Sequence, residues 1–432
     1  MALNPDVMKA VEQLNYRVTV GDVAARAGLD VKLAEQGLLA LASDAGGHLQ
    51  VAESGDVVYQ FPKDFRSVLK NKSLRLQLQA WWDQVWRVLF YLIRISFGIV
   101  LILSILLIVA AISIIVIASS SSNNDDRGID INFSGFNGFG QDFIWIFYPS
   151  YYESPRQHHR LDQDGNPKLN FLEAVFSFLF GDGNPNFDVE ERRWRTIGNL
   201  IRKNQGAVVA EQISPYLDQV SNKDITDNED YMLPVLTRFN GQPEVSPAGE
   251  LVYYFPELQT TVDSTRPLSV PAFLKEQLWA FSQASGSQLV MAGGLGLVNL
   301  VGAIVLGRLL AGSGGIVASV GGLLGFVQGI YWVILGYGLG FLGIPSLRYF
   351  WIKQKNRTLV ERNKQRQQRA AALQAANSTV QQKLSYAQQF AKETVITQQD
   401  LIYTTERDLL QQDAEQVDRI DAEWQRRLTQ GH

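Results

Sequence analysis

The 432-residue chain has no cysteine and only four histidines. The first absence excludes disulfides, thiolate metal sites and cysteine nucleophiles. The histidines share no ligand spacing on one helix, and no catalytic triad, phosphate-binding loop or paired carboxylate is evident. We therefore expect no catalytic, cofactor or metal site, and predict that the protein is not an enzyme. The four histidines are His48, His158, His159 and His432.

The chain also lacks an excess of positive charge, since 39 basic side chains stand against 43 acidic ones. The middle part, residues 119–287, has 13 basic and 23 acidic groups and would repel a polyphosphate. We therefore expect no nucleic-acid partner.

Charge is missing altogether from two long segments. Residues 95–118 contain no charged side chain, and 39 uncharged residues separate Arg308 from Arg348. As a helix the first segment would be about 36 Å long, enough to cross a bilayer once. The two segments indicate an integral membrane protein. Together with the patterns described below, they predict an α+β multidomain membrane protein with two winged-helix-like modules, three to four transmembrane helices and a long C-terminal helical tail.

Composition divides the chain into eight predicted parts. They are a winged-helix-like module at 1–62, an interfacial helix at 63–94, a transmembrane span at 95–118, an aromatic-rich acidic region at 119–187, a second winged-helix-like module at 188–260, a linker at 261–288, a Gly-rich membrane region at 289–346 and a helical tail at 347–432.

The first module is predicted from three short helical patterns followed by two alternating strands around Glu53-Ser54-Gly55-Asp56. Its third helix, near residues 31–42, has Lys32 as its one basic residue, which favours protein docking over DNA recognition. Residues 46–62 match residues 240–256 at an offset of 194, which predicts a second copy of the module. The matched pairs include Gly47 with Gly241, Val51 with Val245, Gly55 with Gly249, Tyr59 with Tyr253, Phe61 with Phe255 and Pro62 with Pro256.

Residues 63–94 combine basic side chains with Trp81, Trp82 and Trp86. Basic groups such as Arg75 suit anionic headgroups and tryptophan suits the membrane interface, so we predict an interfacial helix that contacts membrane lipids. Packing on the first module is the alternative. The basic flanks before Ile95 and after residue 347 both favour the cytoplasmic side, which requires an even number of crossings. The clear spans give an odd number, so either the Gly-rich region crosses the membrane twice or the first span turns back as a hairpin.

The Gly-rich region contains a span at 289–306 and a segment at 310–346 that is too long for one straight crossing, at about 55 Å. Five glycines fall on one helical face, which favours close helix packing within the chain or between subunits of a homo-oligomer. The alternative is a transport path with Asn299 and Gln328 as its polar points. The five glycines are Gly321, Gly325, Gly329, Gly336 and Gly340.

Two further motifs allow alternative interpretations. Asp162, Asp164 and Glu173 have the spacing of calcium ligands, but Pro167 occupies the position that needs glycine, so a solvated turn is favoured. Nine of the 20 residues at 133–152 are aromatic, as in an interfacial loop, an apolar ligand site or a packing layer. The tail is predicted to form two helices, a hairpin or a subunit coiled coil, broken near Thr397-Gln398-Gln399-Asp400.

Several phrases resemble a cyanobacterial and chloroplast integral membrane protein family. The resemblance implies a thylakoid membrane or the plasma membrane of a cyanobacterium, and a chloroplast membrane in plant relatives. A plant member is labelled an iron-sulfur cluster biosynthesis protein, but this chain has no cysteine to hold a cluster, so the label is not transferred. The phrases are Val18-Thr19-Val20-Gly21-Asp22-Val23-Ala24, residues 55–64, residues 176–185, Asp230-Tyr231-Met232-Leu233-Pro234-Val235-Leu236 and Lys392-Glu393-Thr394-Val395-Ile396.

These observations predict a non-enzymatic membrane scaffold or assembly factor that docks partner proteins at a photosynthetic membrane. A transporter or channel component built on the Gly-rich spans is the alternative hypothesis. A membrane-bound transcription regulator is disfavoured, because the predicted recognition surfaces are not basic.

Overall fold

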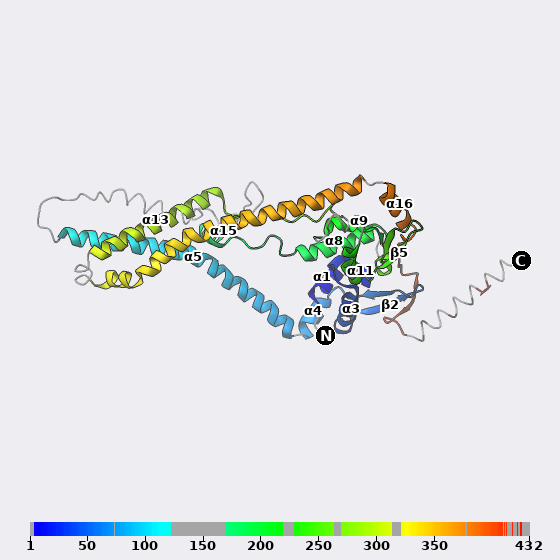
Figure 1. Cartoon of the computed structure of the whole chain (residues 1–432). Coiled ribbons are helices and arrows are strands. Elements are labelled where there is room, and N and C mark those ends of the chain that lie inside the picture. The colour runs from blue at the N-terminus through cyan, green and yellow to red at the C-terminus, as the bar shows by residue number, and fades with distance from the viewer. Residues whose placement is uncertain are drawn as a thin grey trace. The chain divides into compact units, whose positions relative to one another are not determined.

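The structure is a computed structural model that describes residues 4–72, 74–121, 169–218, 229–262, 269–312, 321–375 and 378–408, with single positions between 410 and 425. The chain forms two compact units (Figure 1). The platform unit comprises Met1–Gln79, Asn186–Gln277 and Leu359–His432, and the membrane-helix unit comprises Ala80–Pro185 and Leu278–Thr358.

The first module of the platform unit has three helices and a three-stranded antiparallel sheet in the order β1-β3-β2. Thr19 and Asp22 form a capping box that begins α2, and Gly28 ends this helix with positive φ. The elements are α1 (Pro5–Gln13), β1 (Arg17–Thr19), α2 (Val20–Ala27), α3 (Val31–Ala45), β2 (His48–Ala52) and β3 (Val57–Gln60).

The second module repeats this arrangement with a longer first helix, shorter second and third helices and the sheet order β4-β6-β5. Its hairpin has the same register at the offset of 194, since Val51 pairs with Val57 and Val245 pairs with Leu251. The elements are α8 (Val189–Lys203), β4 (Ala207–Val208), α9 (Ala210–Ile213), η1 (Ser214–Tyr216), η2 (Asp230–Met232), α11 (Leu233–Phe239), β5 (Gln242–Val245) and β6 (Leu251–Tyr254).

Hydrogen bonds outside the strands repeat as well. The Phe61 N–H donates to the Tyr16 carbonyl at 2.8 Å, and the Phe255 N–H donates to the Gly206 carbonyl at the same distance. The N–H groups of Gly47 and Gly241 also donate to carbonyls five residues earlier, at 2.9 Å in each case. The internal repeat seen in the sequence is therefore also a repeat of backbone geometry.

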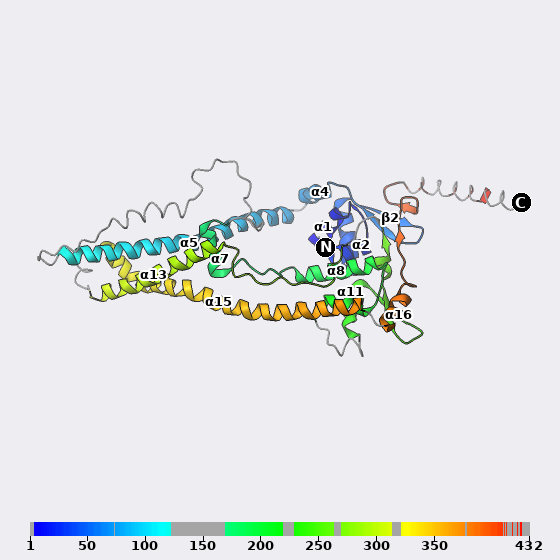
Figure 2. The same ribbon diagram turned by 90° about the horizontal axis from the view of Figure 1, so that it is seen from above.

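The two modules share one hydrophobic core. Helix α2 of the first module packs on α8 of the second, where a Cβ at Gly198 would lie 2.8 Å from the Ala25 Cα (Figure 2). The nearly inaccessible Asp22 carboxylate pairs with Arg202 at 2.6 Å. Because apolar packing and a buried ion pair both join the modules, the two copies form one platform.

The segment after the first module contributes α4 (Phe65–Lys72), whose Phe65 and Leu69 are buried in the platform core. Residues 63–94 are therefore divided: α4 packs on the first module, and α5 (Leu74–Ser121) begins after it. The alternative interpretation, packing on the first module, therefore holds for α4, whereas α5 is a separate helix.

The prediction of a wholly helical tail is wrong between residues 394 and 404. Helix α16 (Ser378–Ala387) is followed by β8 (Thr394–Val395), parallel to β7 (Thr260–Thr261), and by β9 (Leu401–Thr404), antiparallel to β2. Thr397 donates to Asp400 from both its backbone and its hydroxyl at 2.7 Å, but this turn leads into a strand and not a helix. Residues 394–404 form strands because β-branched and aromatic residues predominate among them and because the β2 edge offers unpaired backbone hydrogen-bonding groups.

The β9 strand distinguishes the two modules. The Leu49 N–H on β2 donates to the Thr405 hydroxyl, and the N–H of Glu53, just after β2, donates to the Asp400 carbonyl, both at 2.9 Å. The equivalent positions in the second module are Pro243 and Pro247, which have no N–H to donate. The first module therefore accepts a strand at an edge that proline closes in the second.

The membrane-helix unit contains α7 (Phe171–Phe180), α13 (Gly286–Gly312) and parts of α5 and α15 (Gly322–Gln374). Among the described residues, three helices, α5, α13 and α15, are long and apolar enough to cross a membrane. Helix α5 continues without interruption through residues 95–118, so this predicted span does not turn back as a hairpin. Segments of all three helices pack together around Ile108, Leu306 and Val327.

Candidate functional site

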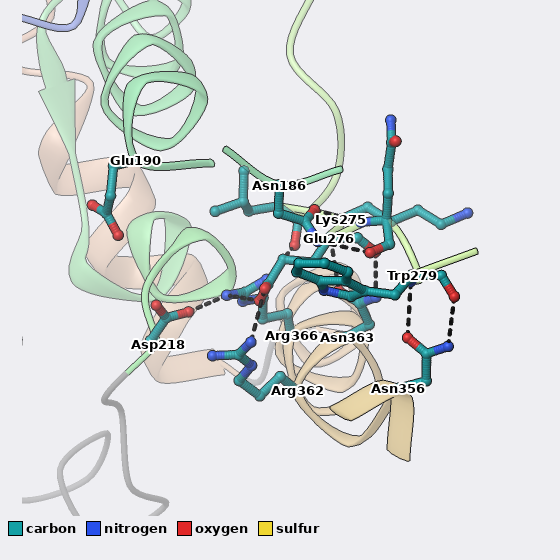
Figure 3. A network of polar contacts seen from close by, with 12 residues as sticks. Asn186, Glu190, Asp218, Lys275, Glu276, Trp279, Asn356, Arg362, Asn363 and Arg366 are labelled. Carbon is teal, nitrogen blue, oxygen red and sulfur yellow. Dashed lines mark hydrogen bonds and ion pairs between the residues drawn. The ribbon is translucent and has the colours of Figure 1, made fainter. Parts of the chain in front are cut away.

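The candidate site is the linker clamp, defined as the extended residues Leu274–Gln277 and the platform side chains that bind them. It lies in the platform unit just before the chain enters the membrane-helix unit. Asn363 binds both backbone groups of Glu276, accepting from its N–H at 2.9 Å and donating to its carbonyl at 2.8 Å (Figure 3). Asn186 does the same to Gln277 at 2.7 Å for both bonds. Two asparagines thus replace the strand neighbour that an extended backbone segment requires.

Arg366 of α15 is the centre of the clamp. Its side chain is inaccessible to solvent, pairs with Glu276 at 2.9 Å and with Asp218, and donates to the Leu274 carbonyl at 2.8 Å. Arg362, one turn earlier on the same helix, donates to the other Glu276 oxygen at 2.8 Å. A buried guanidinium is stable only when its charge is compensated, and the carboxylates of Asp218 and Glu276 supply that compensation, although the Arg366 Nε has no hydrogen-bond partner among the described residues.

Asp218 joins the clamp to the second module. It pairs with Arg366 and with Arg193 of α8, which also donates to the Tyr216 carbonyl at 3.1 Å. Burial alone would raise the pKa of Asp218, but the Arg366 hydrogen bond and the Arg193 charge outweigh it and lower the pKa below its usual value. Asp218 is therefore ionised at neutral pH.

A second polar cluster fixes α16. Lys383 is buried and binds Glu211 and Glu229 at 2.9 Å and Glu250 at 3.1 Å. Burial would lower the pKa of Lys383, but its hydrogen bonds to Glu229 and Glu211 outweigh this and raise the pKa. The lysine is thus charged, and its charge is matched by the second module.

The ion pairs of both clusters hold segments of the platform unit together. Guanidinium or ammonium groups already occupy the carboxylates of Asp218, Glu276, Glu211 and Glu229, so these groups are poor general bases. The described residues contain no group of three or more metal-ligating side chains. The clamp therefore holds the C-terminal part of α15 against the second module and the linker.

The chain is 40% identical over 436 residues to an uncharacterised chloroplastic protein of Arabidopsis thaliana. The match covers 98% of this chain and 81% of the relative. The chain belongs to the family of that protein. No family model matches the chain, and no solved structure matches it. The family assignment agrees with the chloroplast part of the resemblance drawn from the sequence.

The five aligned glycines contact no other helix among the described residues. A Cβ at Gly325, Gly329 or Gly336 would meet nothing within 4 Å, and one at Gly340 would meet only Ile344 of its own helix. Gly321 precedes α15 and has positive φ. Packing by this face within the described chain is thus not observed, and packing against a second copy stays a prediction.

Other glycines, which the sequence pattern did not single out, make the close contacts. A Cβ at Gly302 of α13 would lie 2.9 Å from Ile108, and one at Gly338 of α15 would lie 3.0 Å from the Asn299 Oδ1 and 3.2 Å from the Leu300 Cα. Gly302 and Gly338 lie on different helices and form no regular spacing in the sequence. Only the observed pairing of the helices identifies these two glycines.

The two side chains predicted as polar points of a transport path differ in their exposure to solvent. Asn299 is fully buried on α13 and donates to the Ser104 hydroxyl at 2.7 Å, whereas Gln328 lies exposed on α15. Asn299 therefore serves as a polar contact between helices, as small polar groups do inside membranes.

The predicted interfacial residues have mixed outcomes. Trp81, Trp82 and Trp86 are exposed on α5, as an interfacial role requires, and that role stays a prediction. The Arg75 side chain lies outside the described set. So do residues 133–152, His158 and His159, and Asp162 and Asp164 of the proposed calcium loop. Glu173 lies in α7 and accepts from the Asn170 N–H at 3.1 Å in a capping box.

Proposed function

We propose that the protein is a non-enzymatic scaffold or assembly factor that holds partner proteins at a chloroplast membrane, with thylakoid as the favoured membrane. We also propose that both modules are winged helices adapted to protein docking. The observation that supports this best is the way the linker, α15, α16 and β9 all bind back onto the paired modules. Such anchoring suits a rigid binding surface for other proteins.

The third helices of the modules supply the docking surface in this proposal. Leu39 of α3 and Leu233 of α11 stand at the same place in the repeat and are 45% and 59% exposed. Lys32 is the one basic side chain on α3, so a phosphate backbone would find little to bind. Exposed leucines on a non-basic helix suit a protein partner better.

The membrane assignment combines two findings. The relative is a chloroplastic protein, and three helices here have the length and hydropathy of membrane spans. Because the three segments of the platform unit form one compact unit, we place all three on the same side of the membrane.

The alternative of a transporter has less support. A path would need polar groups that face a common lumen, and Asn299 is enclosed while Gln328 lies on an exposed surface. A solute flux through the purified protein in vesicles would nevertheless replace the scaffold proposal.

The proposal is tested by partner capture with matched variants. The full chain, Leu39→Glu with Leu233→Glu, and the control Val245→Glu are purified in mild detergent from the native membrane. Val245 is exposed but lies on β5, outside the third helices. We expect a stoichiometric partner with the full chain and the control, and its loss from the double variant at unchanged abundance. The same partner retained by all three would contradict the docking surface.

A further inference from the structure

The membrane-helix unit has a cluster of tryptophan and basic side chains just beyond the apolar part of α15. Lys355 lies over two indole rings, with its Nζ 4.1 Å from the Trp279 ring centroid and 4.6 Å from that of Trp351. The two rings meet edge to face at 5.3 Å. Lys353 and Arg357 are exposed on the same helix. These five residues are named the Trp279 cluster.

The cluster is held in place by the backbone of the preceding linker. Asn356 accepts from the Trp279 N–H at 2.8 Å and donates to the Trp279 carbonyl at 2.9 Å (Figure 3). Ile352 is buried on the inner face of α15, so the helix presents Lys353 and Arg357 outward. The cluster is thus a fixed surface and not a set of independent side chains.

Its place along the helix matches a membrane interface. Residues 322–347 of α15 are uncharged and would extend about 39 Å, more than the hydrocarbon core of a bilayer. Trp351 lies four residues beyond Leu347, about 6 Å, which is close to the depth of one headgroup layer. Tyr349, Phe350 and Trp351 are all about half exposed or more, as aromatic residues of an interface are.

No described carboxylate neutralises the charge of the cluster. Among the described residues, Lys353, Lys355 and Arg357 form no salt bridge, in contrast to Arg366, whose charge meets two carboxylates. Three uncompensated cations beside exposed aromatic rings at the end of an apolar helix fit an anionic lipid. An acidic soluble partner would explain the basic residues but not the exposed aromatic rings at the level of the membrane interface.

We propose that the Trp279 cluster binds the headgroups of anionic lipids. Lys353 and Arg357 approach the headgroup anions directly, and the Trp279 and Trp351 rings hold Lys355 at the same level. This inference rests on the membrane placement in the proposed function, but it does not depend on protein docking.

The test uses the detergent-purified, delipidated full chain and two pure lipids, phosphatidylglycerol and phosphatidylcholine. Bound lipid is counted by native mass spectrometry and affinity is followed by the shift of the thermal unfolding midpoint. The lipid-site variant combines Lys353→Gln, Lys355→Gln and Arg357→Gln. The matched control removes three exposed charges of the platform unit, with Lys9→Gln, Lys32→Gln and Lys392→Gln.

We expect the parent and the control to prefer phosphatidylglycerol and the lipid-site variant to lose the preference. Each basic residue near an anionic surface changes partitioning about fivefold, so the affinity should fall on the order of a hundredfold. Lys353→Gln alone, a change at an exposed side chain, should give about a fivefold loss and serves if the triple variant folds poorly. Inorganic phosphate should have no comparable effect in any variant.

Three outcomes would overturn the inference: a parent that does not discriminate between the lipids, a lipid-site variant that binds as the parent does, or equal loss in the control. If the parent stays in carbonate-washed membranes but shows no lipid preference, this inference alone fails. Release of the parent by carbonate would remove the membrane placement and the proposed function together.

Discussion

Replacing Arg366 with methionine tests the linker clamp most sharply, because methionine fills similar space without a charge. The change removes the ion pairs to Asp218 and Glu276 and the hydrogen bond to the Leu274 carbonyl. Glu276 keeps Arg362 as a partner, while Asp218 keeps Arg193. The buried carboxylates therefore lose part of their compensating charge, but not all of it.

Removing one member of a buried ion pair costs about 3–5 kcal/mol, and the remaining arginines place Arg366→Met near the lower end of that range. A platform of this size loses roughly 2–4 °C in unfolding midpoint per kcal/mol, so we expect a fall of roughly 6–12 °C. Adding Glu276→Gln to the variant should recover part of this loss, since it removes the buried carboxylate charge and leaves only the partly exposed Arg362 without that partner.

The assay is thermal unfolding of the purified full chain in detergent, followed by tryptophan fluorescence. Lys364→Met is the matched control, because Lys364 is exposed two residues away on the same helix and should change stability by less than about 0.5 kcal/mol. Equal shifts for Arg366→Met and Lys364→Met would refute the view that the buried guanidinium anchors the linker.

Three further predictions follow from single contacts. The lowered pKa of Asp218 means that its stabilisation is complete above the ordinary carboxyl pKa and is lost as pH falls below about 4, which urea titrations at neutral and acidic pH would detect; an unchanged unfolding free energy would count against it. Gly338→Leu should destabilise the packed helices by about 1–3 kcal/mol, whereas Gly336→Leu should be neutral in detergent melting unless a second copy packs there. Deleting residues 398–432 exposes the β2 edge, so light scattering should show added self-association, and an unchanged size would contradict this.

The repeat and the spans could be predicted because each depends on a local pattern. Alternating apolar residues and Gly55 or Gly249 at the turn specify the same hairpin twice. Likewise, an uncharged apolar run long enough to cross a bilayer is rare in a chain that folds in water. These signals do not require knowledge of which segments meet.

The clamp could not be predicted, because it depends on which segments meet. Asn186 and Asn363 are ordinary polar residues in the sequence, and only the fold brings both to the linker backbone. The strands of the tail were missed for a related reason. Thr397 and Asp400 resemble a helix cap locally, but the free edge of β2 decides the outcome.

The glycine stripe shows the same limit in the membrane-helix unit. Regular spacing identified Gly325 and Gly329, yet the helices approach each other at Gly302 and Gly338. Spacing indicates which glycines share a face, but the partner helix determines which face is packed.

Residues 1–79, 186–277 and 359–432 form one platform, and we place this platform on one side of a membrane. Because the chain has no cysteine, single cysteines at exposed positions can be labelled without background. Ser54→Cys, Ala248→Cys and Gln399→Cys, one in each segment, should all react with an impermeant maleimide from the same side of sealed vesicles. Gly312→Cys, at the end of α13, should react only from the other side. Labelling of any of the first three from the Gly312 side would contradict this placement.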